Sequence, residues 1–205
     1  MSTELRHDWR KTPATLVILG AALAGFLLVY LPFPTRWVAA LTFAPFRLTA
    51  QGPVFGPLDG EYWRLVTPVF LHFGWLHIVF NGLWCWDLGG RIERTLGSTT
   101  LVGLFFAIAL CSNAAQYLYT GPVLFGGLSG VVYGFLGFSW VAGRLCPRWQ
   151  LQPPPAIMAL MVGWLLLCMA GVVELLGFGA IANAAHLGGL VSGAALGAAL
   201  AVVYR

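Results

Sequence analysis

The chain has 205 residues, of which 59% are hydrophobic and only 9% are charged. A soluble globular domain carries about 25% charged residues, so this composition excludes an ordinary soluble domain and predicts a protein with several membrane spans. The net charge of +4 does not indicate nucleic-acid binding, because the basic residues are scattered among the segments between the apolar stretches.

Six stretches are apolar enough to cross the membrane, whose hydrocarbon layer of about 30 Å needs roughly 17–25 helical residues. They cover residues 14–31, 76–90, 101–119, 128–143, 157–176 and 183–204. Residues 76–90 are too few to cross, so we expect that helix to extend at both ends. Residues 128–143 cover about 24 Å at 1.5 Å per residue, so we expect one end of that helix to stop below the membrane surface.

We therefore predict an all-α bundle of six transmembrane helices, with a cytoplasmic tail over residues 1–13 and a single domain over residues 14–205. The first apolar stretch follows a basic segment, as the apolar part of a signal peptide does. However, Pro32, Phe33 and Pro34 follow it in place of a clear small-residue cleavage site, which favours a retained helix. We see no internal repeat and no second domain.

The first loop, residues 32–68, is rich in aromatic and aliphatic side chains. Pro45, Pro53 and Pro57 interrupt it and argue against a long helix. A segment of this composition would be poorly soluble if it were extended in water, and Trp and Tyr side chains concentrate at membrane interfaces. We expect this first loop to be partly embedded in the outer leaflet.

Basic residues predict the orientation of the bundle, because cytoplasmic segments carry an excess of Lys and Arg. Eight of the eleven basic residues lie at the termini and in the second-to-third and fourth-to-fifth connections: Arg6, Arg10, Lys11, Arg91, Arg94, Arg144, Arg148 and Arg205. The other three, Arg36, Arg47 and Arg64, lie in the first loop. Both termini are therefore predicted to face the cytoplasm, which agrees with an even number of spans.

Ser129 lies in the sequence GGLSG (residues 126–130) and is expected in the first turn of the fourth helix. The glycines allow a turn closed to other residues, and a helix N-terminus offers unpaired N–H groups for an anion. Tyr133 lies four residues later and shares a helix face with Ser129. The alternative is a buried serine that only bonds its own backbone.

His186 is expected one turn into the sixth helix, at a depth similar to that of Ser129. Small residues at every fourth position let two membrane helices approach closely. Such residues occur in both helices: Gly130 and Gly134 in the fourth, and Ala185, Gly189, Gly193 and Gly197 in the sixth. Close approach would bring Ser129 and His186 within hydrogen-bonding distance. The alternatives are a structural histidine and glycines that serve packing alone.

His77 and Asn81 are four residues apart near the outer end of the second helix, and therefore on one face. As hydrogen-bond donors they are suited to stabilise an oxyanion. His72 is expected to orient backbone in the preceding turn. Three histidines raise the alternative of a metal site, but no HExxH motif occurs and no carboxylate lies near them in sequence. We therefore expect no metal and no other cofactor.

The four cysteines show no short pair spacing, and three of them lie in membrane stretches: Cys85, Cys111 and Cys168, with Cys146 in a connection that we place in the cytoplasm. Such cysteines favour neither a disulfide framework nor a zinc site.

Four motifs, in this order, resemble those of the rhomboid family of intramembrane serine proteases, in particular its compact bacterial six-helix form. They are Trp63-Arg64, His77 with Asn81, Gly127-Leu128-Ser129-Gly130 with Tyr133 and Gly134, and Ala185-His186 with Gly189. The similarity runs from about Glu61 to the C-terminus. Each motif is weak alone, but the four together are highly specific.

The resemblance implies a role for each matching residue. Ser129 and His186 would be catalytic, and His77 and Asn81 would stabilise the oxyanion. Tyr133 would pack against the catalytic imidazole, and Phe80 would lie near the substrate entrance. Apart from the resemblance, the turn and the small-residue spacing described above lead us to expect that Gly127 and Gly130 support the site and that Gly134, Gly189 and Gly193 pack the helices.

The residues and the resemblance together predict an intramembrane endopeptidase that cleaves transmembrane segments of other membrane proteins near the outer leaflet. It would use a Ser–His dyad and an acyl-enzyme, because Asp87 lies too deep and Glu174 lies on another helix. A bacterial inner-membrane protein whose active site opens to the periplasm is expected, with the bilayer and transmembrane substrates as partners and no nucleic acid. The alternatives are a proteolytically silent relative that binds membrane helices, and a small transporter.

Overall fold

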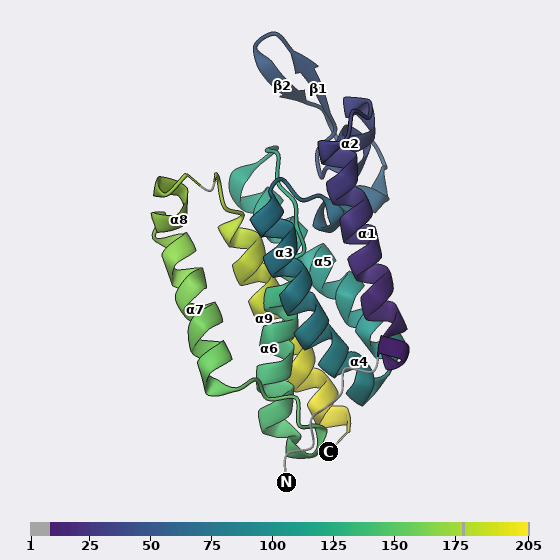
Figure 1. Cartoon of the computed structure of the whole chain (residues 1–205), viewed down its shortest axis with the longest axis vertical. Helices are drawn as coiled ribbons and strands as arrows, with labels where there is room; N and C mark the ends of the chain where they lie inside the picture. The colour runs from purple at the N-terminus through teal and green to yellow at the C-terminus, as the bar shows by residue number, and fades with distance from the viewer. Residues whose placement is uncertain (1–8, 178, 205) are drawn as a thin grey trace.

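The computed structural model describes residues 9–177 and 179–204 and shows a bundle of helices that run along its long axis (Figure 1). Within these residues, three helices are long and apolar enough to cross a membrane by length and composition: α1 (Pro13–Tyr30), α5 (Ser98–Thr120) and α9 (Asn183–Val203). One shorter apolar helix is found in the same residues, α7 (Pro155–Met169). The helix α6 (Ser129–Leu145) has 17 residues. The mainly helical class is confirmed, and the count of six spans stays a prediction.

The second predicted helix is longer than expected, but mainly at one end. α3 (Trp75–Trp84), a π-helical turn η4 (Cys85–Gly89) and α4 (Gly90–Leu96) follow one another without a break. The backbone at Gly74 is extended, so the extension at the N-terminal end amounts to a single residue, Trp75. The helix continues at the other end, where Arg91 pairs with Asp87 one turn earlier at 2.9 Å, a spacing that adds modest support to a helix.

The fifth predicted helix, residues 157–176, is broken. α7 ends at Met169, and a short α8 (Val172–Leu175) follows. Gly171 separates them with a φ of 75°, a conformation that glycine adopts without steric cost at the end of a helix. The expectation of one unbroken helix is wrong, and Gly171 is the sequence signal of the break.

The first loop contains a short helix and a β-hairpin, so the fold departs from the predicted all-α class in this segment. α2 (Thr35–Leu41) precedes β1 (Phe46–Thr49) and β2 (Gly52–Phe55), which pair antiparallel with Phe46 opposite Phe55. The hairpin projects beyond α2 at one end of the bundle (Figure 1). Four 3-10 turns complete the described elements: η1 (Trp9–Lys11), η2 (Tyr62–Leu65), η3 (Thr67–Phe70) and η5 (Pro147–Trp149).

Two buried charged side chains hold the ends of the bundle together. Arg64 donates to the carbonyl oxygens of Ala39 and Thr42 and pairs with Glu61 at 2.7 Å, which ties η2 to α2. Glu93 of α4 accepts hydrogen bonds from the first turn of α1 and from Ser98 at the start of α5. Arg64 is therefore ion-paired and Glu93 is hydrogen-bonded, which offsets the cost of burying each charge.

α6 and α9 approach each other closely through their glycines. A Cβ atom on Gly189 would overlap the carbonyl oxygen of Gly130, and one on Gly193 would overlap that of Gly134. The predicted small-residue stripes therefore face each other along this helix pair. This contact brings the first turns of α6 and α9 together.

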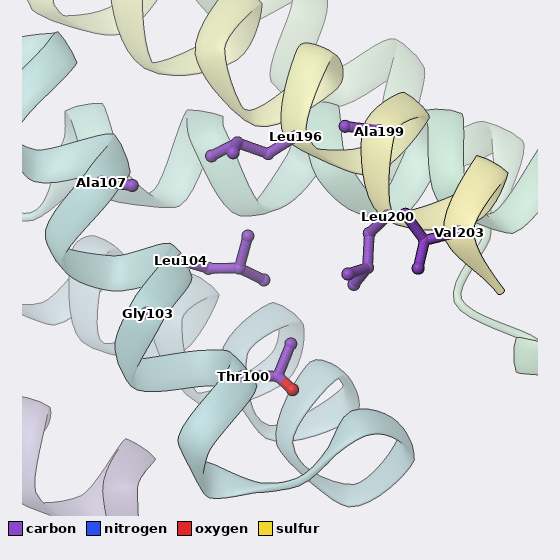
Figure 2. Close-up of a pocket in the computed structure, with 8 residues that line it drawn as sticks. All are labelled: Thr100, Gly103, Leu104, Ala107, Leu196, Ala199, Leu200 and Val203. Carbon is purple, nitrogen blue, oxygen red and sulfur yellow. The ribbon is translucent and has the colours of Figure 1, made fainter.

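α5 packs against α9 tightly at one end and loosely at the other. Near the start of α9, a Cβ atom on Gly188 would lie 2.6 Å from the Cβ atom of Ala115. Toward the other end, an apolar cavity of about 400 Å³ separates the two helices (Figure 2). Its lining includes Gly103 and Ala107 of α5 and Ala199 of α9.

Candidate active site

Ser129 is the first residue of α6 and follows a turn that only glycine fits. Gly127 has a φ of 112°, and a Cβ atom there would lie 2.5 Å from the imidazole of His77. The N–H of Gly127 donates to the carbonyl oxygen of Pro68 at 3.0 Å. The predicted position of Ser129 in the first turn of the fourth helix is therefore the observed one.

His186 lies in the first turn of α9 and meets Ser129. Its Nε2 atom forms a hydrogen bond with Oγ of Ser129 at 2.8 Å. The imidazole is buried, and within the described residues its Nδ1 atom has no hydrogen-bond partner. No described carboxylate therefore orients this ring through Nδ1.

Tyr133 packs its ring against the imidazole of His186. Its ring centroid lies 4.9 Å from that of His186, with the two planes inclined by 41°. Its hydroxyl donates to the carbonyl oxygen of Met161 on α7, at 3.0 Å. Tyr133 thus links the imidazole of His186 to a separate helix.

His77 and Asn81 face the turn that precedes Ser129. The Cβ position of Gly127 lies 3.6 Å from Nδ2 of Asn81, so both polar side chains of α3 converge on this peptide. Asn81 is buried, and its Nδ2 has no partner in the described part of the chain. An unpaired buried amide is costly, which marks it as a donor available to a further group.

His72, in the loop before α3, supports the same turn. Its Nε2 accepts a hydrogen bond from the N–H of Leu128 at 3.2 Å, and its Nδ1 donates to the carbonyl oxygen of Phe70 at 3.1 Å. These two bonds require a neutral ring protonated at Nδ1. Burial lowers the pKa of His72, and the nearby His77 lowers it further. His72 thus orients the peptide between Gly127 and Leu128 as well as its own loop.

A family model described as the Rhomboid domain matches residues 59–202, which is well over half of the chain. The chain belongs to the Rhomboid family. This finding confirms the resemblance drawn from the four motifs. Together with its apolar helices, it identifies the protein as an integral membrane protein.

This rhomboid chain is similar to proteins named Rhomboid protease GlpG. It is 48% identical over 133 residues to that of Serratia proteamaculans (strain 568). It is 44% identical over 133 residues to those of Yersinia pseudotuberculosis serotype I (strain IP32953) and Yersinia pestis (strain Pestoides F). Each match covers 65% of this chain and 46% of the relative, so the chain spans about half the length of the curated relatives it matches.

Phe80 lies on α3 beside Asn81 in sequence, but on a different face. Its side chain is 55% exposed, whereas that of Asn81 is buried. The structure therefore separates Phe80 from the polar cluster around Ser129. A place at the substrate entrance remains a prediction for this residue.

Two polar residues near the rhomboid site were not among those that the sequence predicted. Oε1 of Gln116 on α5 accepts a hydrogen bond from the N–H of Ala185. Nδ2 of Asn183, the first residue of α9, donates to the carbonyl oxygen of Cys168 on α7 at 3.1 Å. A polar side chain within an apolar helix was the available signal, but its partner depends on tertiary packing.

Three of the histidine ring nitrogens form hydrogen bonds with protein groups. His72 uses both ring nitrogens, and His186 uses Nε2. Among the residues that the structure describes, no three His, Cys, Asp or Glu side chains group as metal ligands. The rhomboid site is thus built from a hydroxyl, imidazoles and an amide.

Proposed function

We propose that this rhomboid chain is an intramembrane serine endopeptidase in which Ser129 is the nucleophile and His186 the general base. The hydrogen bond of 2.8 Å between Oγ of Ser129 and Nε2 of His186 carries the proposal. Within this distance, a neutral imidazole protonated at Nδ1 accepts the hydroxyl proton as Oγ attacks a peptide carbonyl. His186 then donates that proton to the leaving amine, and water hydrolyses the acyl-enzyme by the same route.

The negative charge that develops on the carbonyl oxygen needs donors. Asn81 offers a buried Nδ2 without a partner among the described residues, and His77 lies against Gly127 in the turn before Ser129. Donors held in a water-poor site stabilise a transition-state oxyanion more than they would in water. We assign His77 and Asn81 to this role, with Gly127 letting the turn lie against His77 and Gly130 letting α6 lie against Ser112 and Ala185.

A dyad accounts for the site better than a triad. Asp87 pairs with Arg91, and Glu174 accepts a hydrogen bond from the N–H of Ile181 in the connection before α9. Neither carboxylate is therefore assigned to His186. Tyr133 takes over the orientation of the imidazole through its ring contact.

The substrate class follows from the membrane setting. We propose that the chain crosses the bilayer six times with both termini in the cytoplasm of a bacterium, and that the site opens to the periplasm. Its substrates would then be transmembrane segments of other proteins that unwind near the outer leaflet. The exposed Phe80 on α3 is assigned to the substrate entrance. The alternatives of a silent helix-binding relative or a transporter leave the Ser129–His186 hydrogen bond without a purpose.

The test is cleavage of a labelled type I membrane protein by the detergent-purified chain. Ser129→Ala should abolish cleavage and His186→Ala should do the same, because the two groups act as one unit. Ser139→Ala is the matched control, since Ser139 is a buried serine on the same helix and should be dispensable. Substantial cleavage by Ser129→Ala would refute the assignment of the nucleophile.

A further inference from the structure

A buried amide on α5 connects that helix to the first turn of α9. Oε1 of Gln116 accepts a hydrogen bond from the N–H of Ala185 at 3.0 Å, and Gln116 is 4% exposed. A buried amide in an apolar segment is costly unless its polar atoms are paired. This hydrogen bond satisfies Oε1 of Gln116, and its donor belongs to the residue before His186.

The start of α9 depends on such outside support. α9 has no side-chain cap of its own, and the first N–H groups of a helix lack partners within it. The N–H of His186 bonds back to the carbonyl oxygen of Ala182 at 3.2 Å. Gln116 therefore caps α9 from a neighbouring helix, through the N–H of Ala185, the residue before His186.

The chain leading into α9 is held by two hydrogen bonds, from the N–H of Ile181 to Glu174 and from Asn183 to the carbonyl oxygen of Cys168 on α7, rather than by a buried side-chain core. Leu175 and Leu176 are exposed, and Gly177 and Gly179 have positive φ angles. Residues in such a connection make few packing contacts that fix the direction of the helix that follows. The position of the first turn of α9 must therefore come from the helices beside it.

The packing of α5 against α9 is tightest where Gln116 lies. Gly188 leaves no room for a side chain next to Ala115, one residue before Gln116. At the other end of the same helix pair, the apolar cavity of Figure 2 separates the two helices. Gln116 therefore belongs to the end of the contact that restrains His186.

We propose that Gln116 is a positioning residue that sets the distance between Nε2 of His186 and Oγ of Ser129; this inference rests on the proposed protease function. Proton transfer needs a heavy-atom distance of about 2.6–3.2 Å, and the observed 2.8 Å lies inside that range. A misplacement of about 1 Å can cost roughly 10²-fold in rate. Loss of the Gln116 bond would release the turn that carries His186.

The experiment compares Gln116→Met, which removes the acceptor at similar volume, with Gln116→Glu, which keeps an acceptor oxygen. Asn113→Leu is the matched control, because Asn113 is a similarly buried amide on α5 that donates to Leu65 and Val66 in the first loop. For each purified variant, kcat, KM and melting temperature are measured with the labelled membrane substrate. The rate at which a fluorophosphonate probe labels Ser129 gives a readout independent of substrate binding.

We expect Gln116→Met to lower kcat and the labelling rate about 10-fold, a smaller loss than that of a full 1 Å misplacement, while KM changes less than about 2-fold. Gln116→Glu should recover most of the rate, and Asn113→Leu should lower only the melting temperature. An equal loss of kcat in Gln116→Met and Asn113→Leu, or a fall in melting temperature with normal kcat in Gln116→Met, would overturn the proposal.

Two further measurements keep the outcome interpretable. If Gln116→Met does not fold, Gln116→Asn carries the same test, because the shorter side chain keeps the amide and withdraws its oxygen from Ala185. The unsubstituted chain and Ser129→Ala are assayed in parallel. If the unsubstituted chain shows no cleavage that Ser129→Ala abolishes, the protease function itself is refuted. If the unsubstituted chain cleaves and Gln116→Met has the same kcat and labelling rate, only the positioning role is refuted.

Discussion

At the scale of single residues, Tyr133 combines two separable contacts. Its ring lies against His186, and its hydroxyl donates to Met161 on α7. A phenylalanine keeps the first contact and loses the second, whereas a leucine loses both. The two substitutions therefore distinguish orientation of the imidazole from attachment of α7.

We predict that Tyr133→Phe keeps kcat within about 3-fold and lowers the melting temperature by about 2–4 °C, since a lost hydrogen bond contributes about 1 kcal/mol. Tyr133→Leu should lower kcat about 10-fold, because the imidazole loses the aromatic surface that orients it. Steady-state cleavage and thermal unfolding of the same samples measure both effects. Equal kcat in the phenylalanine and leucine variants would show that the ring contact is irrelevant to catalysis.

Asn81 should act on the transition state rather than on substrate binding. Asn81→Ala removes an amide that we assign to the oxyanion, and loss of one such donor typically lowers turnover by about 10²–10³-fold. KM should change little, and the melting temperature should stay close to that of the unsubstituted protein, because Nδ2 has no partner among the described residues. A marked loss of stability with unchanged turnover would instead make Asn81 a structural residue.

The sequence made part of this site predictable, because local spacing brings some of its residues together. The i, i+4 spacing predicts that Ser129 shares a face with Tyr133, and the small-residue stripes predict the approach of His186. The partners of His72 and Gln116 lie 56 and 69 residues away in the chain. No local pattern specifies such pairs, so they emerge only from the tertiary structure.

At the scale of elements, the contact between α6 and α9 holds the two reactive side chains together. Gly193 lies against the carbonyl oxygen of Gly134, whereas Gly103 on α5 borders the cavity in Figure 2 and has open space at its Cβ position. The same substitution at these two glycines therefore has opposite consequences. A side chain at position 193 would overlap the backbone of α6, whereas a side chain at position 103 would enter open space.

We predict that Gly193→Leu destabilises the protein by about 3 kcal/mol or more, because forcing atoms into a packed interface shifts the backbone. It should also abolish cleavage, since α9 carries His186. Gly103→Leu should leave cleavage near normal and keep or raise the melting temperature, because leucine has the higher helix propensity. Thermal unfolding and activity of both variants test this, and a tolerated Gly193→Leu would contradict the close approach of α6 and α9.

Three element boundaries differ from those that the sequence predicts, each for a physical reason. Hydropathy ends the second apolar stretch before Arg91, but the helix continues to Leu96, with Arg91 paired to Asp87 one turn earlier. Hydropathy also runs α7 and α8 together, because it does not register the backbone preference of Gly171. The sequence did not predict the hairpin in the first loop, because prolines usually indicate a break rather than a strand.

At the scale of the whole molecule, the orientation in the membrane is the decisive prediction. The hairpin and the connection between α6 and α7 lie at opposite ends of the bundle (Figure 1). Arg144 and Arg148 belong to the second of these ends, which the excess of basic residues assigns to the cytoplasm. The site at the first turn of α6 then faces the periplasmic side.

Native Cys146 is a poor probe of this orientation, although it belongs to the connection that we place in the cytoplasm. It is buried, and its thiol contacts the carbonyl oxygen of Ala201. A membrane-impermeant thiol reagent would miss it from either side. Exposed positions in a chain without native cysteines are required instead, and Gln51 at the hairpin turn and Gln152 before α7 provide them.

We predict that, in a variant lacking the four native cysteines, Gln51→Cys reacts with an impermeant maleimide added to intact spheroplasts, whereas Gln152→Cys reacts only after lysis. The reason is the eight-to-three division of the eleven basic residues between the two sides. Protease activity of the cysteine-free chain serves as the control for its fold. The reverse labelling pattern would place the Ser129–His186 pair near the cytoplasmic leaflet. Substrates would then have to unwind at the opposite membrane surface, and the assignment of a periplasmic opening would be lost.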